Sequence, residues 1–93
     1  MAHTKPENLK DLSAELAAIR ALPGMVEKKP GIFYFKSAGI LHFHDKDGTR
    51  WADVKLAGEW TRVDVDFGAS KAAKAKLLKM ASAALAQFQK AAK

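Results

Sequence analysis

The fold is decided by residues 32–67, IFYFKSAGILHFHDKDGTRWADVKLAGEWTRVDVDF, in which apolar and polar side chains alternate. A period of two is typical of β-strands that bury one face, and clusters of turn residues mark where each strand ends. The pattern predicts four strands, at residues 32–36, 40–44, 49–56 and 59–67. The connections are too short for a parallel crossover, so we expect an antiparallel meander.

The alternation assigns each strand residue to one of two faces. One face is apolar and is predicted to be the core: Phe33, Phe35, Leu41, Phe43, Ala52, Val54, Leu56, Val63, Val65 and Phe67. The opposite face is polar and aromatic: Tyr34, His42, His44, Trp51, Asp53, Lys55, Trp60, Arg62, Asp64 and Asp66.

The register of the sheet follows from the lengths of its turns. A first turn of three residues ending at Gly39 places Phe35 opposite Leu41, and the next two turns are expected to have four and two residues. On the polar face this register predicts four pairs of neighbours: Tyr34 with His42, His42 with Trp51, Asp53 with Arg62 as an ion pair, and Lys55 with Trp60 as a cation–π contact.

Helical periodicity flanks the strands on both sides. Apolar residues at spacings of three and four predict an amphipathic helix over residues 7–21, opened by a capping box at Thr4–Glu7. Residues 25–31 are predicted to be a connector. Ser70 is a good N-cap for a second, alanine-rich helix. The apolar stripe of that helix consists of Leu77, Ala81, Ala84, Leu85 and Phe88.

Two amphipathic helices and a sheet with one apolar face predict a single α+β domain over residues 1–93. We expect a two-layer sandwich with both helices on one face of the four-stranded sheet and the other face open. The ends, residues 1–5 and 90–93, are expected to be frayed. The sequence contains no cysteine, no apolar run of membrane-spanning length and no secretion signal. It therefore predicts a cytoplasmic protein without a membrane partner.

The net charge of +6 is confined to the C-terminal part of the chain. Residues 1–67 balance their basic and acidic groups, whereas residues 68–93 contain lysines and no acid. Such a local excess of positive charge attracts nucleic acid. The candidate contacts are Lys71, Lys74, Lys76 and Lys79. The simpler alternative is a solvated lysine face that keeps an alanine-rich helix soluble.

Three segments resemble an uncharacterised family of small bacterial proteins: GIFYFKS at residues 31–37, LHFHD at residues 41–45 and ADVK at residues 52–55. This resemblance implies a bacterial cytoplasmic protein and no particular activity. The order of helix, meander and helix is also similar to frataxin-like domains. The acidic first helix of those domains is not matched, because residues 7–21 balance their charges.

His42 and His44 are the sharpest local feature of the sequence. Residues two apart on a strand project to the same face with Cα atoms about 6.5 Å apart, so both imidazoles can reach one metal ion. Asp53 or Tyr34 would supply a third ligand, or His42 and Asp53 an acid–base pair. The alternative is that the histidines line the face, hydrogen-bonded and stacked against aromatic rings. We therefore expect no cofactor, and binding is favoured over enzymatic activity.

The function that the sequence favours is that of a small non-enzymatic interaction module. Exposed tryptophans are typical of surfaces that bind a protein partner or a second copy of the same chain, as in a homodimer. The predicted binding face consists of Tyr34, His42, His44, Trp51, Asp53, Trp60 and Arg62. Nucleic-acid binding through the lysine helix is the alternative. A metal-dependent or acid–base activity at His42 and His44 is the third hypothesis.

Overall fold

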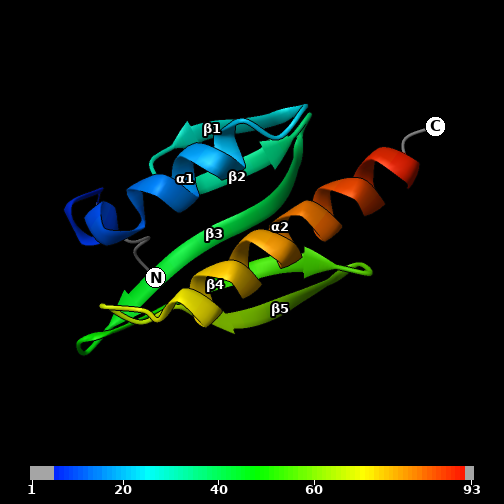
Figure 1. Ribbon diagram of the computed structural model, residues 1–93. Helices are drawn as coiled ribbons and strands as arrows, with labels where there is room; N and C mark the ends of the chain where they lie inside the picture. Colours follow the sequence, from blue (N-terminus) through cyan, green and yellow to red (C-terminus); the bar gives the residue numbers. More distant parts are fainter. Residues whose placement is uncertain (1–5, 92–93) are drawn as a thin grey trace.

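The computed structural model describes residues 6–91 and has the predicted α+β order of helix, antiparallel meander and helix (Figure 1). A 3₁₀ helix, η1 (Pro6–Leu12), leads into α1 (Ser13–Arg20), and α2 (Lys71–Ala91) follows the sheet. The strands are β1 (Met25–Lys29), β2 (Ile32–Phe35), β3 (Ala38–Lys46), β4 (Thr49–Leu56) and β5 (Glu59–Asp64). They form one sheet in the order β1-β2-β3-β4-β5.

The presence of β1 corrects the predicted four-stranded meander to five strands. Residues 25–31 were predicted to be a connector, yet Met25 pairs with Phe35 and Lys29 with Ile32. Only Met25 of this strand is buried, so its sequence, MVEKK, shows little alternation. Lysines at a sheet edge discourage pairing with other chains, and an edge strand needs few buried residues. Because residues 27–29 are polar, the apolar alternation that identifies a strand is absent from β1, and the sequence did not predict it.

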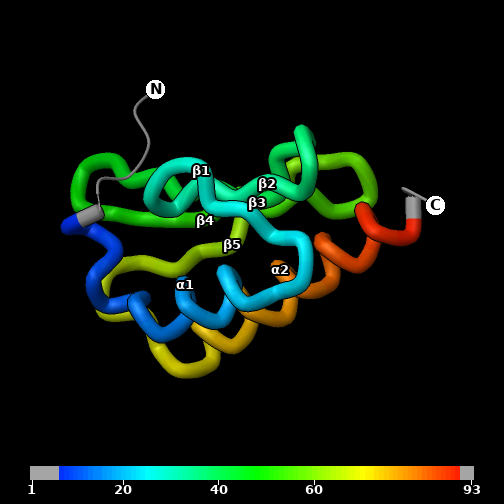
Figure 2. The backbone as a smooth tube through the Cα atoms, turned by 90° about the horizontal axis from the view of Figure 1, so that it is seen from above, coloured from blue at the N-terminus to red at the C-terminus, as the bar shows by residue number. Residues whose placement is uncertain are grey.

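Both helices lie on one side of the sheet, and no element of residues 6–91 covers the other side (Figure 2). α2 packs on β3, β4 and β5, while α1 packs against α2 and β1. The core between the two layers consists of Leu9, Leu12, Leu16, Ile19, Met25, Phe33, Ile40, Leu41, Phe43, Ala52, Val54, Val63, Val65, Leu77, Ala81, Ala84 and Leu85. Phe35 and Leu56, also predicted as core, are half-buried at its margin.

Two of the three predicted turn lengths are wrong. The β2–β3 turn has two residues, Lys36-Ser37, and so does the β3–β4 turn, Asp47-Gly48. Asp47 and Gly48 both have positive φ angles, 53° and 80°, which match the right-handed twist of a two-residue hairpin. The β4–β5 turn, Ala57-Gly58, has the predicted two residues.

A bulge in β3 also changes the register with β2. Tyr34 pairs with Gly39, and Phe33 pairs with Leu41, so Ile40 is the extra residue. Leu41 is therefore opposite Phe33 and not opposite Phe35. Ile40 and Leu41 are adjacent in the chain and are both fully buried, which a regular strand would not allow.

The first helix differs from the prediction of one helix over residues 7–21. It begins as η1 and becomes α-helical only at Ser13. The carbonyl oxygen of Asn8 accepts a hydrogen bond from Arg50 at 2.7 Å, a contact with the sheet that the local sequence does not reveal. The predicted capping box at Thr4–Glu7 lies largely outside the described residues, as does the expected fraying of residues 1–5, 92 and 93. Lys90 and Ala91 belong to α2.

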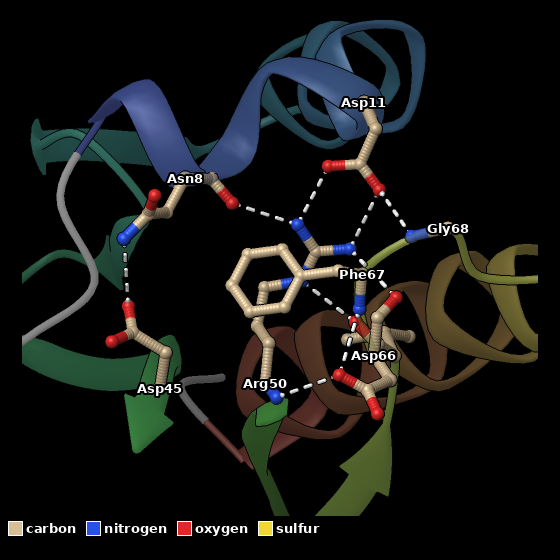
Figure 3. Close-up of polar contacts among 8 residues, drawn as sticks. Asn8, Asp11, Asp45, Arg50, Asp66, Phe67 and Gly68 are labelled. Carbon is tan, nitrogen blue, oxygen red and sulfur yellow. Dashed lines mark hydrogen bonds and ion pairs between the residues drawn. The ribbon is translucent and has the colours of Figure 1, made fainter. Parts of the chain in front are cut away.

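Arg50 fastens η1 to the sheet (Figure 3). Its side chain is fully buried, and all five guanidinium N–H groups find an acceptor. These bonds run from Nε to the Val65 carbonyl (2.7 Å), from Nη1 to the Asn8 carbonyl (2.7 Å) and Asp11 Oδ1 (2.6 Å), and from Nη2 to Asp11 Oδ2 (2.8 Å) and the Asp66 carbonyl (3.0 Å). A buried cation is tolerated only when paired in this way.

Phe67 was predicted to lie in the core but is 42% exposed. β5 ends at Asp64, before the alternation of the sequence ends. The ring centroid of Phe67 lies 4.7 Å from the Arg50 guanidinium carbon. The ring therefore covers the guanidinium group on its solvent side. Phe67 forms this cation–π contact at the surface and does not enter the core.

Acid should weaken the contact between Asp11 and Arg50. Hydrogen bonds from Arg50 are the main cause that lowers the pKa of Asp11 from 3.8 to about 2. The unfolded chain binds more protons in this interval, so the stabilisation is complete above pH 3.8 and is lost as the pH falls through about 2. Because the Asp11 side chain is 35% exposed, solvent screening reduces the expected loss to about 1 kcal/mol.

Denaturant unfolding of the wild type and of Asp11→Asn measures this effect. The free energy of unfolding of the wild type should fall more steeply between about pH 5 and pH 2 than that of the variant. Equal slopes for the two proteins would show that Asp11 has the same pKa in the folded and unfolded states.

Candidate functional site

The side of the sheet that no element of residues 6–91 covers is called the outer face. It carries Tyr34, His42, His44, Trp51, Asp53, Lys55, Trp60, Arg62 and Asp64, which come from β2, β3, β4 and β5. All seven residues of the predicted binding face are among them. Asp66, which was assigned to the same face, lies beyond the end of β5. Its carboxylate Oδ1 accepts a hydrogen bond from the backbone N–H of Arg50 at 3.1 Å.

The outer-face neighbours of the two histidines differ from the predicted ones. His42 pairs with Asp53, and His44 pairs with Trp51. The prediction had His42 beside Trp51 and Tyr34, but Tyr34 pairs with Gly39. The β3–β4 turn is two residues shorter than predicted, which shifts the pairing by two. A shift of two keeps each residue on its face and changes only its neighbours.

Aromatic rings pack around both histidines. The ring centroids of His42 and His44 are 4.5 Å apart with an interplanar angle of 88°. The Trp60 ring lies 4.5 Å from His42, and the Trp51 ring lies 5.6 Å from His44. His44 is only 6% exposed, although no helix of residues 6–91 covers this side of the sheet.

Trp60 reaches from β5 to β3 across the outer face. A Cβ atom added at Gly39 would lie 3.7 Å from Cη2 of Trp60 and 3.8 Å from Cε2 of Tyr34. Both rings therefore lie within van der Waals reach of position 39, with the indole and the tyrosine ring over the same glycine. Trp60 is still 45% exposed, so much of its ring faces solvent.

A cation lies over each of the two indoles. The Nζ atom of Lys55 is 5.0 Å from the Trp60 ring centroid, as the register predicted. The guanidinium carbon of Arg62 is 4.5 Å from the Trp51 ring centroid. These contacts hold the long side chains against the sheet and leave their charges at the surface.

The predicted ion pair between Asp53 and Arg62 is replaced by two other contacts. Asp53 and Arg62 are register partners, but Arg62 Nε donates a hydrogen bond to Asp64 Oδ1 at 2.8 Å. Asp53 Oδ2 instead lies 3.2 Å from Nε2 of His44. The carboxylate of Asp53 is therefore directed to the histidines.

His42, His44 and Asp53 form the one cluster in residues 6–91 that offers three candidate metal ligands close together. One ligand atom of each residue lies within 4.8 Å of the others. Tyr34, the alternative third ligand in the sequence interpretation, contacts a lysine through its ring. Its ring lies 4.7 Å from Nζ of Lys28 on the neighbouring strand β1.

The lysines of the nucleic-acid alternative lie on a different surface. Lys71, Lys76 and Lys79 are exposed, and Lys74 is half-buried. They belong to α2, which packs on the inner side of the sheet, so the outer face and the lysines do not form one site. Ser70 caps this helix as predicted, because its Oγ accepts a hydrogen bond from the N–H of Ala73 at 3.2 Å.

Within residues 6–91, neither helix is of a length and apolar character that would let it cross a membrane. No protein-family model matches the chain, and no curated protein and no solved structure matches it. The resemblance to a family of small bacterial proteins therefore stays a prediction from three short segments.

Proposed function

We propose that the chain is a small non-enzymatic interaction module and that its outer face binds a second copy of the same chain. The observation that carries this proposal is the exposed indole of Trp60 on a sheet face that no helix of the described chain covers. The surface continues over Tyr34, His42 and Trp51. Tryptophan, tyrosine and arginine are the residues that contribute most at protein interfaces.

The charges of the outer face favour a second copy as the partner. Lys55 and Arg62 supply two cations, and Asp53 and Asp64 supply two anions. A face that carries both signs can pair with itself about a two-fold axis, with each cation opposite an anion of the other copy. The lysine side of α2 contains only cations and would repel its own copy.

Association should depend on Trp60. A well-packed interface tryptophan contributes about 2 kcal/mol or more, so Trp60→Ala should raise the dissociation constant of the dimer at least about 30-fold. Sedimentation equilibrium over a range of concentrations measures the mass against the 10.1 kDa of one chain. The double variant Trp51→Ala/Trp60→Ala should be monomeric throughout, with the circular dichroism of the wild type.

Phe67→Ala is the matched control, because Phe67 is about as exposed as Trp60 but lies outside the outer face. Its association should equal that of the wild type. A wild-type chain that stays monomeric at about 1 mM would contradict self-association. In that case amide NMR shifts on adding single-stranded nucleic acid decide the alternative, since salt-sensitive shifts confined to Lys71–Lys79 would favour nucleic-acid binding by α2.

A further inference from the structure

We infer that His42, His44 and Asp53 form a binding site for one Zn²⁺ ion on the outer face. A single chain supplies all three ligands, so the site does not depend on association of two copies. The ligands come from neighbouring central strands of the sheet, and His42 and Asp53 are direct register partners. The proposal adds a ligand of defined chemistry to a face that otherwise offers only a contact surface.

The distances within the cluster suit a tetrahedral ion. Zinc with bonds of about 2.0–2.1 Å holds its ligand atoms about 3.3 Å apart. Nε2 of His44 and Oδ2 of Asp53 are already 3.2 Å apart. All three ligand atoms lie within 4.8 Å of one another, so closing the site requires a side-chain rotation and no movement of the strands.

The surroundings hold the ligands in place. Trp60 packs against His42, and Trp51 packs against His44, with ring centroids 4.5 Å and 5.6 Å away. Ligands on strands keep a fixed spacing better than ligands on loops, and an apolar shell limits the access of water to the metal. The indoles therefore have a role in this site that is separate from contact with a partner.

The donor atoms suit zinc better than calcium or magnesium. Two imidazoles and one carboxylate are a ligand set of catalytic and exchangeable zinc sites, which leave a fourth position for water or another ligand. Calcium and magnesium require more oxygen ligands than one carboxylate supplies. The chain contains no cysteine, so thiolate ligands are unavailable to any metal it binds.

Titration with zinc at protein concentrations below those that allow association tests the inference. Both tryptophans of the chain adjoin the site, so their fluorescence reports on its occupancy. We expect one Zn²⁺ per chain. Loss of a residue that only hydrogen-bonds to a metal ligand lowers metal affinity about 10–100-fold. His42 and Asp53 are direct ligands, so His42→Ala and Asp53→Asn should each weaken zinc binding by at least about 100-fold.

Asp47→Asn is the matched control for Asp53→Asn, because Asp47 is an exposed carboxylate in the β3–β4 turn and is not part of the three-ligand cluster. Its zinc affinity should equal that of the wild type. NMR of the wild type gives a second measurement that needs no variant, since one equivalent of zinc should shift the ring resonances of His42 and His44 together. The inference is overturned if zinc does not bind, if binding survives His42→Ala, if it is lost in Asp47→Asn, or if the two rings do not shift.

Discussion

Replacing Arg50 by methionine should lower the free energy of unfolding by about 3–5 kcal/mol. Methionine is long and apolar and fills much of the same space, so the loss reports on the hydrogen bonds more than on packing. The variant leaves the carbonyl groups of Asn8, Val65 and Asp66 without the donors that Arg50 supplies. For a small domain with a total stability of about 5–10 kcal/mol this is a large fraction.

The size of the effect follows from the number of segments that one side chain connects. Arg50 lies on β4, Asn8 and Asp11 on η1, and Val65 and Asp66 in the connector after β5. Lysine keeps the charge but has neither the planar fork nor the five donors. Arg50→Lys should therefore recover only part of the loss.

Denaturant unfolding measures these changes, and Arg62→Met is the matched control. Arg62 forms an ion pair with Asp64 at the surface, where both side chains are largely exposed. Such pairs contribute about 0–1 kcal/mol, so the control should change stability little. Equal losses for Arg50→Met and Arg62→Met would mean that the buried hydrogen bonds of Arg50 merely replace bonds to water.

The importance of Arg50 could have been partly predicted from the sequence. It has the same parity in its strand as Ala52 and Val54, so the alternation already points a charged residue inward. A charge at an inward position requires partners. The sequence could not identify Asp11 as the partner, because Asp11 is 39 residues away and lies in a segment with an ordinary helical pattern.

The sequence predicted which residues lie on the outer face, but it did not predict which of them are neighbours of the two histidines across strands. Membership of a face depends only on parity, and both register errors preserved parity at His42, His44 and Trp51. The neighbours depend on turn lengths, and here a shorter turn and a bulge decide them. The sequence therefore identified His42 and His44 as candidates but could not show that Asp53 lies opposite His42. β1 was missed for a related reason, since an edge strand with one buried residue leaves almost no pattern to detect.

Replacing Gly31 by alanine should lower the free energy of unfolding by about 2–4 kcal/mol. Gly31 has a φ angle of +77°, a conformation that costs an alanine about 1 kcal/mol or more. A Cβ atom there would also lie 2.8 Å from Cδ1 of Leu9 and 3.3 Å from Cδ1 of Phe43, both buried in the core. Forcing a methyl group into a packed core adds about 1–3 kcal/mol.

Gly48→Ala separates the two contributions. Gly48 has nearly the same φ angle, +80°, but nothing lies within 4 Å of the added Cβ atom. This control should lose only the backbone contribution of about 1 kcal/mol. The difference between the two variants in denaturant unfolding is then the cost of the clash with Leu9 and Phe43. Equal losses would show that Leu9 moves away without cost.

Whether Leu9 can move depends on Arg50, because Leu9 belongs to η1 and Arg50 fastens η1 to the sheet. Releasing η1 should let Leu9 withdraw from a methyl group at residue 31. We therefore expect the double variant Arg50→Met/Gly31→Ala to lose less stability than the sum of the single variants, by about 1 kcal/mol. Strict additivity would mean that η1 keeps its position without Arg50, and that the packing of Leu9, Leu12 and Leu16 alone holds it on the sheet.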